Sequence, residues 1–106
     1  YALSAFAALS QPTRLAVFRA LIQAGPDGMA AGEISDQLEV RQNTLSANLS
    51  VLLNAGLVRN ERQGRFIRYY VHMDGVRGLL SFLLQDCCGG RAEICAPVIS
   101  ELSCGC

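Results

Sequence analysis

The chain has 106 residues, of which 51% are hydrophobic, and its nine Lys and Arg side chains balance nine Asp and Glu. A chain of this length closes one hydrophobic core, so a single small domain is expected. It has no run of about 18 apolar residues and no charged leader followed by a cleavage site. The composition therefore excludes a membrane span and a secretion signal, and indicates a soluble cytoplasmic protein.

The neutral total hides a basic segment. Residues 41–71 contain five Arg and one acid, Glu61, whereas the segments on either side are acidic on balance. Every basic residue is Arg, which suits planar contact with phosphate or guanine, although a GC-rich genome would give the same bias. Zero net charge therefore does not exclude a nucleic-acid partner.

Two helices are predicted at the start of the chain. Residues 2–9 are apolar and rich in helix formers, and Ser10 is expected to cap a second helix with Pro12 in its first turn. Gly25 and Pro26 end that helix in a turn. Its apolar side chains recur every three or four residues, at Leu15, Phe18, Leu21 and Ile22.

A helix-turn-helix is predicted next. A short helix runs from Gly32 to Leu38, and after a break at Glu39 and Val40 a second helix begins near Gln42. This second helix has leucines on one side and polar or small residues on the other, which is typical of a DNA-reading helix but also of a solvated face. The side chains expected to face outward and contribute to base readout are Gln42, Asn43, Thr44, Ser46 and Asn48.

Residues 57–62 and 66–71 are β-prone, and residues 63–65 between them favour a turn, so the pair is predicted to form a hairpin. A hairpin directly after a helix-turn-helix is a wing. Arg62 and Arg65 at its tip are expected to contact the DNA backbone or the minor groove. The predicted fold is mainly α with a β-hairpin wing, which is a winged helix-turn-helix.

A last amphipathic helix is predicted to begin at Val76, with apolar side chains up to Leu84, and to end at residues 87–90. Together with residues 2–9 it offers more apolar surface than a lone small domain can cover, so these two segments are expected to form the seam of a homodimer. Residues 1–88 are assigned to the DNA-binding and dimerisation domain. Residues 89–106 are assigned to a cysteine-containing tail with partial order at most.

All five cysteines fall within the last twenty residues of the chain. In a reducing cytosol, clustered cysteines are better explained as metal ligands or redox thiols than as disulfides, and their odd number adds to that case. Free cysteines can also be small buried hydrophobes at a dimer seam. The five are Cys87, Cys88, Cys95, Cys104 and Cys106.

The segment from Val40 to Val58, VRQNTLSANLSVLLNAGLV, together with the wing RNERQGRFIRYY, resembles the ArsR/SmtB family of arsenic- and metal-responsive repressors. With ALSQPTRLAVFRAL, which resembles the second helix of that family, the likeness extends from Leu9 to about Leu84. It implies a homodimeric winged helix-turn-helix repressor that binds operator sites in double-stranded DNA and is not an enzyme.

The family places its sensing ligands at several positions, and two of them are not matched here. Residues 33–38, EISDQL, hold no thiol where one site type has an ELCVC-like stretch. Another type holds zinc across the dimer through Asp and His pairs of the last helix, where this chain offers only Asp74, with His72 before it as a strand-end residue. DCCGGRAEIC resembles a subset of arsenic repressors that have three thiols here, namely Cys87, Cys88 and Cys95.

This likeness implies As(III) as the effector, because trivalent arsenic favours thiolate sulfur and completes a pyramidal site with three sulfurs. Adjacent cysteines diverge on a regular helix, but Gly89 and Gly90 would let the helix end unwind so that both thiols reach one ion. Sb(III) is chemically similar, and methylarsenite would need only two thiols. No organic cofactor is implied.

Three alternatives remain open. Cd(II), Pb(II) or Zn(II) prefer four ligands and would need Cys104 or Cys106. Oxidation of neighbouring thiols to a disulfide would make the protein a redox switch. A thiol enzyme or metal carrier has little support, because the chain has no Cys-x-x-Cys in a βαβ setting, no catalytic Cys and His pair, and no Gly-rich phosphate loop.

Overall fold

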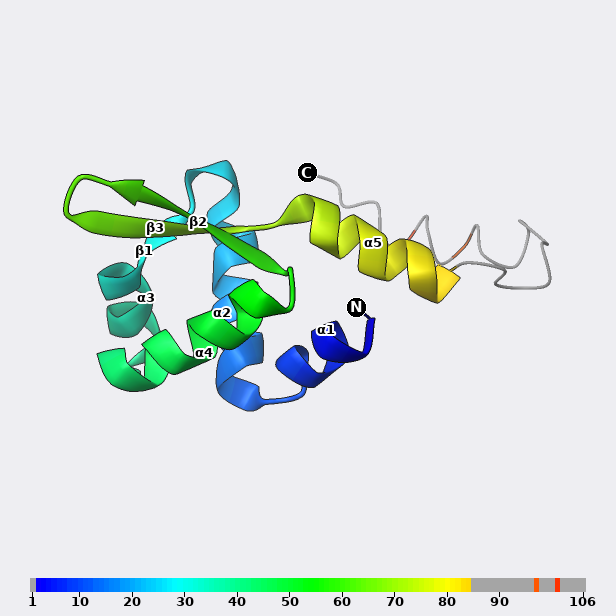
Figure 1. Cartoon of the computed structure of the whole chain (residues 1–106), viewed down its shortest axis with the longest axis horizontal. Helices are drawn as coiled ribbons and strands as arrows, with labels where there is room; N and C mark the ends of the chain where they lie inside the picture. The colour runs from blue at the N-terminus through cyan, green and yellow to red at the C-terminus, as the bar shows by residue number, and fades with distance from the viewer. Residues whose placement is uncertain (1, 85–96, 98–100, 102–106) are drawn as a thin grey trace.

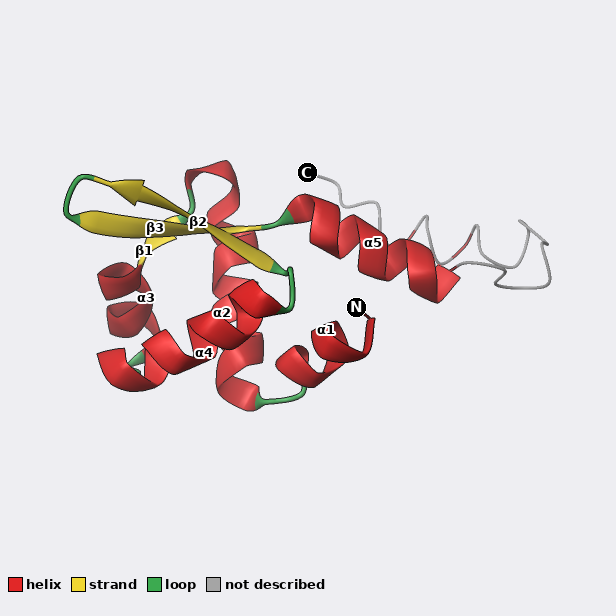
Figure 2. Cartoon of the chain, viewed as in Figure 1, coloured by secondary structure: helices red, strands yellow, loops and turns green. Residues whose placement is uncertain are grey.

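The computed structural model of the chain describes residues 2–84, 97 and 101. Helices make up most of this part, and a small sheet runs along one side (Figures 1 and 2). In chain order the elements are α1 (Ala2–Leu9), α2 (Pro12–Ala24), the 3-10 turn η1 (Gly25–Asp27), β1 (Met29–Ala30), α3 (Ala31–Leu38), α4 (Gln42–Asn54), β2 (Val58–Gln63), β3 (Phe66–Val71) and α5 (Met73–Leu84). The predicted helical fold with a hairpin wing is confirmed.

The start of α2 differs from the prediction by one residue. Gln11 has an extended backbone, and its side-chain oxygen accepts a hydrogen bond from the backbone N–H of Arg14 at 2.8 Å. Gln11 is therefore the N-cap, and the prediction of Ser10 is wrong. The Ser10 hydroxyl instead donates to the carbonyl of Ala7 at 2.8 Å, at the end of α1.

The core is built around α2, which contacts α1, α3, α4 and β3. Its buried side chains are Val17, Phe18, Ala20 and Leu21. Leu15 and Ile22, which were predicted to belong to the buried stripe, are 42% and 50% exposed. The prediction placed the buried face of α2 by its large apolar side chains. The buried face also includes the small Ala20, so it is rotated relative to the predicted one. The large fully buried side chains outside α2 are Ile34, Leu45, Leu49, Leu52 and Leu57, the last of which lies between α4 and β2.

The sheet is antiparallel, and β3 lies between β1 and β2. The pairing of β2 with β3 runs from Val58 opposite Val71 to Gln63 opposite Phe66, which leaves a two-residue turn. Gly64 takes the first position of that turn with φ 63°, as glycine does in the primed turns that suit hairpins. The predicted hairpin is thus confirmed, with its first strand displaced by one residue.

The short strand β1 was not predicted, because two residues are too few to show an alternating pattern. It pairs Met29 with Tyr69 and follows Gly28, which has φ 64°. A Cβ added at Gly28 would lie 2.4 Å from the carbonyl oxygen of Tyr69 and 2.6 Å from the ring of Tyr70. Only glycine therefore allows η1 to pack this closely on β3.

The turn of the helix-turn-helix is short and uses a left-handed residue. Glu39 caps the C-terminal end of α3, with φ 54° and ψ 45°, and its N–H donates to the carbonyl of Ser35. The Ser35 hydroxyl donates to the carbonyl of Val40, so the turn is fixed from both sides. The first helix begins at Ala31, one residue earlier than predicted, and α4 begins at Gln42 as predicted.

The last helix starts three residues earlier than expected, at Met73, because the N–H of Val76 already donates to the carbonyl of His72 at 3.1 Å. α5 contacts α1, and Figure 1 shows both at the end of the molecule away from the wing. α5 buries Leu79 but leaves four large apolar side chains exposed, namely Met73, Leu80, Phe82 and Leu83. None of the helices that the structure describes is long and apolar enough to cross a membrane.

Candidate nucleic-acid interface

The first two turns of α4 carry most of the predicted reading face. Leu45 and Leu49 are each 1% exposed and anchor the helix in the core. Around them, four polar side chains of this face are exposed, as predicted: Gln42, Asn43, Thr44 and Ser46. The Asn43 side-chain oxygen accepts from the backbone N–H of Thr44 at 2.8 Å, which helps to satisfy the start of the helix.

Asn48 does not belong to this face, and its predicted outward orientation is wrong. It is 8% exposed, and its side-chain oxygen accepts a hydrogen bond from Arg14 at 3.3 Å. Asn48 follows Leu45 by three residues and precedes Leu49, so the 3.6-residue period places it on the buried side of α4. A buried polar group is tolerated there because it has a partner.

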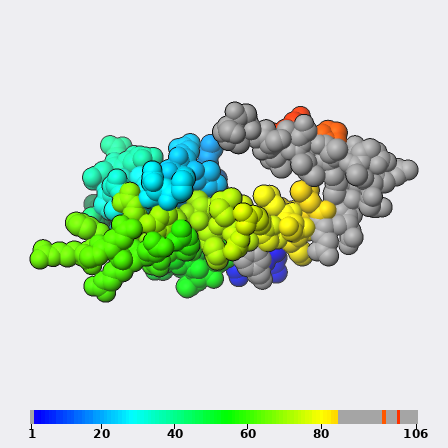
Figure 3. Space-filling model, turned by 90° about the horizontal axis from the view of Figure 1, so that it is seen from above, coloured from blue at the N-terminus to red at the C-terminus, as the bar shows by residue number. Residues whose placement is uncertain are grey.

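The hairpin projects as a narrow arm at one end of the molecule (Figure 3). Its turn lies at the same end as the N-terminal end of α4, whereas α5 extends toward the opposite end (Figure 1). Arg62 and Arg65 near the hairpin turn are exposed, as predicted. The structure therefore brings the polar face of α4 and two arginines of the wing to one end of the fold.

The five arginines of the basic segment divide into two groups. Arg59 forms an ion pair with Glu61 at 3.0 Å, and its guanidinium lies 4.2 Å above the ring of Tyr70. Arg68 donates to the carbonyl of Asp27 at 2.6 Å, so these two arginines make contacts within the chain. The other three are exposed: Arg41, Arg62 and Arg65.

Sequence reasoning missed Arg41 as a candidate contact. It is the N-cap of α4, with φ −62° and ψ 144°, and its side chain is exposed beside the reading face. Phosphate contacts are often made where a helix begins, by backbone N–H groups and by basic side chains. The signal was present in the sequence as an arginine directly before the predicted start of the recognition helix.

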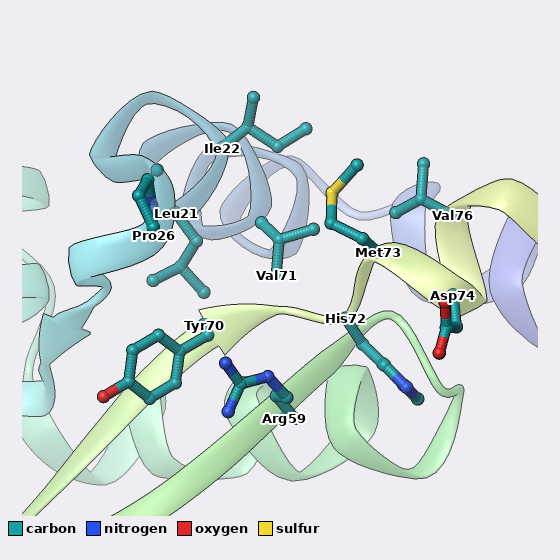
Figure 4. A pocket seen from close by; sticks show the side chains of 11 residues that line it. Leu21, Ile22, Pro26, Arg59, Tyr70, Val71, His72, Met73, Asp74 and Val76 are labelled. Carbon is teal, nitrogen blue, oxygen red and sulfur yellow. The ribbon is translucent and has the colours of Figure 1, made fainter.

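A cleft of about 680 Å³ lies where α2, β3 and the start of α5 meet (Figure 4). Leu21, Ile22, Val71 and other apolar side chains line most of it. Its charged groups have partners in the chain, because Asp74 pairs with Arg77 at 2.8 Å and Arg59 pairs with Glu61. The exposed charges near the wing turn make that end, and not this cleft, the better candidate site.

The predicted metal ligands Cys87, Cys88 and Cys95, with Cys104 and Cys106, lie outside the described residues. Within the described part, no three His, Cys, Asp or Glu side chains gather into a group that could hold a metal. His72 directly follows β3, and its backbone N–H donates to the carbonyl of Leu57 at 2.9 Å, in agreement with its assignment as a strand-end residue.

Comparison with known proteins agrees with this geometry. A family model described as a helix-turn-helix domain matches residues 9–61. The arsenical resistance operon repressor of Bacillus subtilis is 35% identical over 83 residues, which cover 78% of this chain and 75% of that protein. The chain belongs to the ArsR/SmtB family of winged helix-turn-helix transcriptional regulators.

Solved structures of ArsR/SmtB-type regulators share the fold. An ArsR-like transcriptional regulator from Rhodococcus sp. RHA1 matches with a TM-score of 0.72 and 25% identity, over 99% of this chain and 94% of that one. A homodimeric winged helix-turn-helix DNA-binding domain from Mycobacterium bovis matches with a TM-score of 0.64 and 28% identity, over 79% and 78% of the two chains. This ArsR/SmtB member is thus a DNA-binding regulator and not an enzyme.

Proposed function

We propose that the protein is a homodimeric repressor that binds operator sites in double-stranded DNA and releases them when As(III) binds its cysteines. The observation that carries the DNA-binding part is the placement of the α4 polar face and the exposed wing arginines at one end of the fold. A helix of this kind fits the major groove, and a wing beside it reaches the backbone or minor groove.

The two elements have different roles in this proposal. The side chains of α4 that contribute to base readout are Gln42, Asn43, Thr44 and Ser46. Arg62 and Arg65 hold the backbone or the minor groove, and exposed Arg41 adds a phosphate contact at the start of α4. Phosphate contacts fix the position of the protein, whereas base contacts carry the sequence information.

The dimer brings two such surfaces to one DNA duplex. Its seam is formed by α1 and α5, which contact each other and expose large apolar side chains. Leu3 is 84% exposed, Phe6 is 41% exposed, and Phe82 is 57% exposed. A seam of this composition matches the apolar core of homodimer interfaces. The homodimeric state of the Mycobacterium bovis domain supports the same assembly.

The effector assignment rests on the cysteines and on the arsenical resistance repressor of Bacillus subtilis. Cys87, Cys88 and Cys95 supply three thiolates to one As(III) or Sb(III) ion in each subunit. In the sequence, Cys87 and Cys88 follow Leu84, the last residue of α5, after two intervening residues. Binding at that point reshapes the seam and changes the spacing of the two recognition helices.

Selection from a random duplex library tests the DNA-binding part. A single enriched sequence with two half-sites is expected, and the variants Gln42→Ala and Arg65→Ala then separate the two roles. Gln42→Ala should relax the base preference, whereas Arg65→Ala should weaken binding to all sequences and reduce the salt slope by about one. No enrichment at low salt would contradict the proposed function, and an unchanged salt slope for Arg65→Ala would contradict the role of the wing.

A further inference from the structure

Arg14 lies outside the proposed DNA surface and makes contacts to two other helices. It lies in α2, and its Nε donates to the carbonyl of Ala8 at 2.7 Å while its Nη2 lies 3.4 Å from the carbonyl of Ala7. Its Nη1 donates to the side-chain oxygen of Asn48 at 3.3 Å. One guanidinium thus joins the end of α1 to the middle of α4.

The contact to α1 has a clear electrostatic reason. α1 has eight residues, and none in its last turn is basic. The last carbonyls of a helix lack partners within the helix and carry partial negative charge, so a cation beside them is favourable. Arg14 provides that cation from the neighbouring helix, and its planar fork reaches two of these carbonyls at once.

The contact to α4 is equally specific. Apart from Tyr70, Asn48 is the one buried side chain with a polar group among residues 2–84, and it stands between the buried Leu45 and Leu49 of the recognition helix. Beside it, α1 and α4 are separated by a hollow of about 300 Å³ lined by Ser4, Ala7, Val51 and others. Arg14 itself lines this hollow and links the two helices through its hydrogen bonds.

We propose that Arg14 and Asn48 are a positioning pair, which fixes the rotation and depth of the recognition helix α4 relative to the seam helix α1. This inference depends on the proposed function, since it takes α1 to lie in the dimer seam and α4 to read DNA. In a dimer, both α4 helices must meet successive major grooves, so a small rotation of either helix puts base contacts out of register.

A purely stabilising role makes a different prediction. Loss of stability alone lowers the fraction of folded protein and weakens all DNA binding in proportion. Loss of positioning reduces the preference for the selected duplex over random DNA in protein that is folded and dimeric. The salt slope stays the same in that case, because neither residue is placed at a phosphate.

The test measures the affinity of full-length variants for the duplex enriched by selection and for random DNA, alongside sedimentation and circular dichroism. Asn48→Leu keeps the branched shape and the number of heavy atoms of the side chain but removes the acceptor, and it should lower the preference for the selected duplex about tenfold. Asn48→Asp keeps the acceptor and should retain the preference. Arg14→Ala should lower this preference by about the same factor as Asn48→Leu does. The double variant should lower it no further than either single variant.

Arg19→Ala is the matched control, since it removes the same charge from an exposed position of the same helix. It should leave the preference at the wild-type value. A folded, dimeric Asn48→Leu protein with the wild-type preference for the selected duplex would overturn the inference. This variant is sufficient for the test even if Arg14→Ala fails to fold. Wild-type protein that shows no preference at all would instead overturn the proposed function and the inference with it.

Discussion

The Nη1 atom of Arg68 in β3 lies 3.3 Å from the Oε1 atom of Glu33 in α3, although 35 residues separate them in the chain. The same carboxylate oxygen accepts from the backbone N–H of Ala30 at 2.9 Å, at the start of α3. Arg68 also donates to the carbonyl of Asp27 at 2.6 Å. One arginine therefore ties the wing to η1 and to the first helix of the helix-turn-helix.

Replacing Arg68 with Ala should lower the free energy of unfolding by about 1 kcal/mol, mainly through loss of the bonds to backbone carbonyls. The ion pair itself adds little, because the side chains of Arg68 and Glu33 are 30% and 56% exposed. Affinity for DNA should also fall, since the wing is no longer held against α3. Urea unfolding and a DNA titration measure the two effects.

Arg77→Ala is the control for the Arg68 variant. Arg77 pairs with Asp74 at 2.8 Å, but these side chains are 71% and 81% exposed. An exposed pair of this kind contributes little to stability, so the urea midpoint should stay close to that of the wild type. If Arg77→Ala were as destabilising as Arg68→Ala, the special role of the Arg68 contacts would be disproved.

Gly28→Ala should be markedly more destabilising than Gly25→Ala. Both glycines have positive φ, at 64° and 68°, so an alanine is strained at either position. Only at Gly28 would the added Cβ also meet the backbone of Tyr69 and the ring of Tyr70, whereas nothing lies within 4 Å at Gly25. The overlap should cost about 1 to 3 kcal/mol beyond the common strain. Thermal unfolding of the two variants side by side checks this, and equal losses would contradict it.

Leu80→Glu and Leu83→Glu should each convert the proposed dimer to a monomer. These side chains are 44% and 48% exposed in the single chain, and the proposed seam buries them. A carboxylate forced into an apolar interface loses its hydration without a partner, so association is lost. Ile67→Glu, at a 43% exposed position of the wing, should remain dimeric. Sedimentation equilibrium measures the oligomeric state of each variant. An unchanged dimer for Leu80→Glu and Leu83→Glu would contradict the proposed position of the dimer seam.

Periodicity in the sequence predicted the fold well where a whole element repeats the same pattern. The leucines of α4 marked its buried side, and the turn residues between β-prone segments located the hairpin. The short strand β1 and the Gln11 cap were missed for a different reason. Each depends on a contact with a distant or neighbouring residue that a pattern of apolar side chains does not encode.

Asn48 shows the same limit at the candidate site. An asparagine among Gln, Thr and Ser is expected to face solvent, but it is buried because Arg14 supplies a donor from another helix. Arg68 is the converse case, since it lies in the basic segment but its side chain holds the wing. Which polar groups find partners within the chain is a property of the tertiary fold.

The proposed As(III) site consists of cysteines, so serine variants of these residues test it. Changing Cys87, Cys88 or Cys95 singly to Ser should leave DNA binding intact and raise the As(III) concentration needed for release. Changing Cys104 and Cys106 together should matter much less, because a site closed by a longer segment costs more chain entropy. Adding hydrogen peroxide in metal-free buffer to the wild type and the same variants tests whether the protein is a redox switch. In that case the oxidant alone should release the DNA.

The most direct test is the fluorescence anisotropy of the selected duplex bound to the full chain, titrated with As(III) and in parallel with Sb(III), methylarsenite, Cd(II), Pb(II) and Zn(II). We expect As(III) to release the DNA, with a coupling free energy of about 1 to 3 kcal/mol or more. We expect the three single Ser variants to resist release while the Cys104/Cys106 double variant responds. A complex that As(III) leaves intact, or a double variant that fails to respond while Cys95→Ser responds normally, would contradict the account.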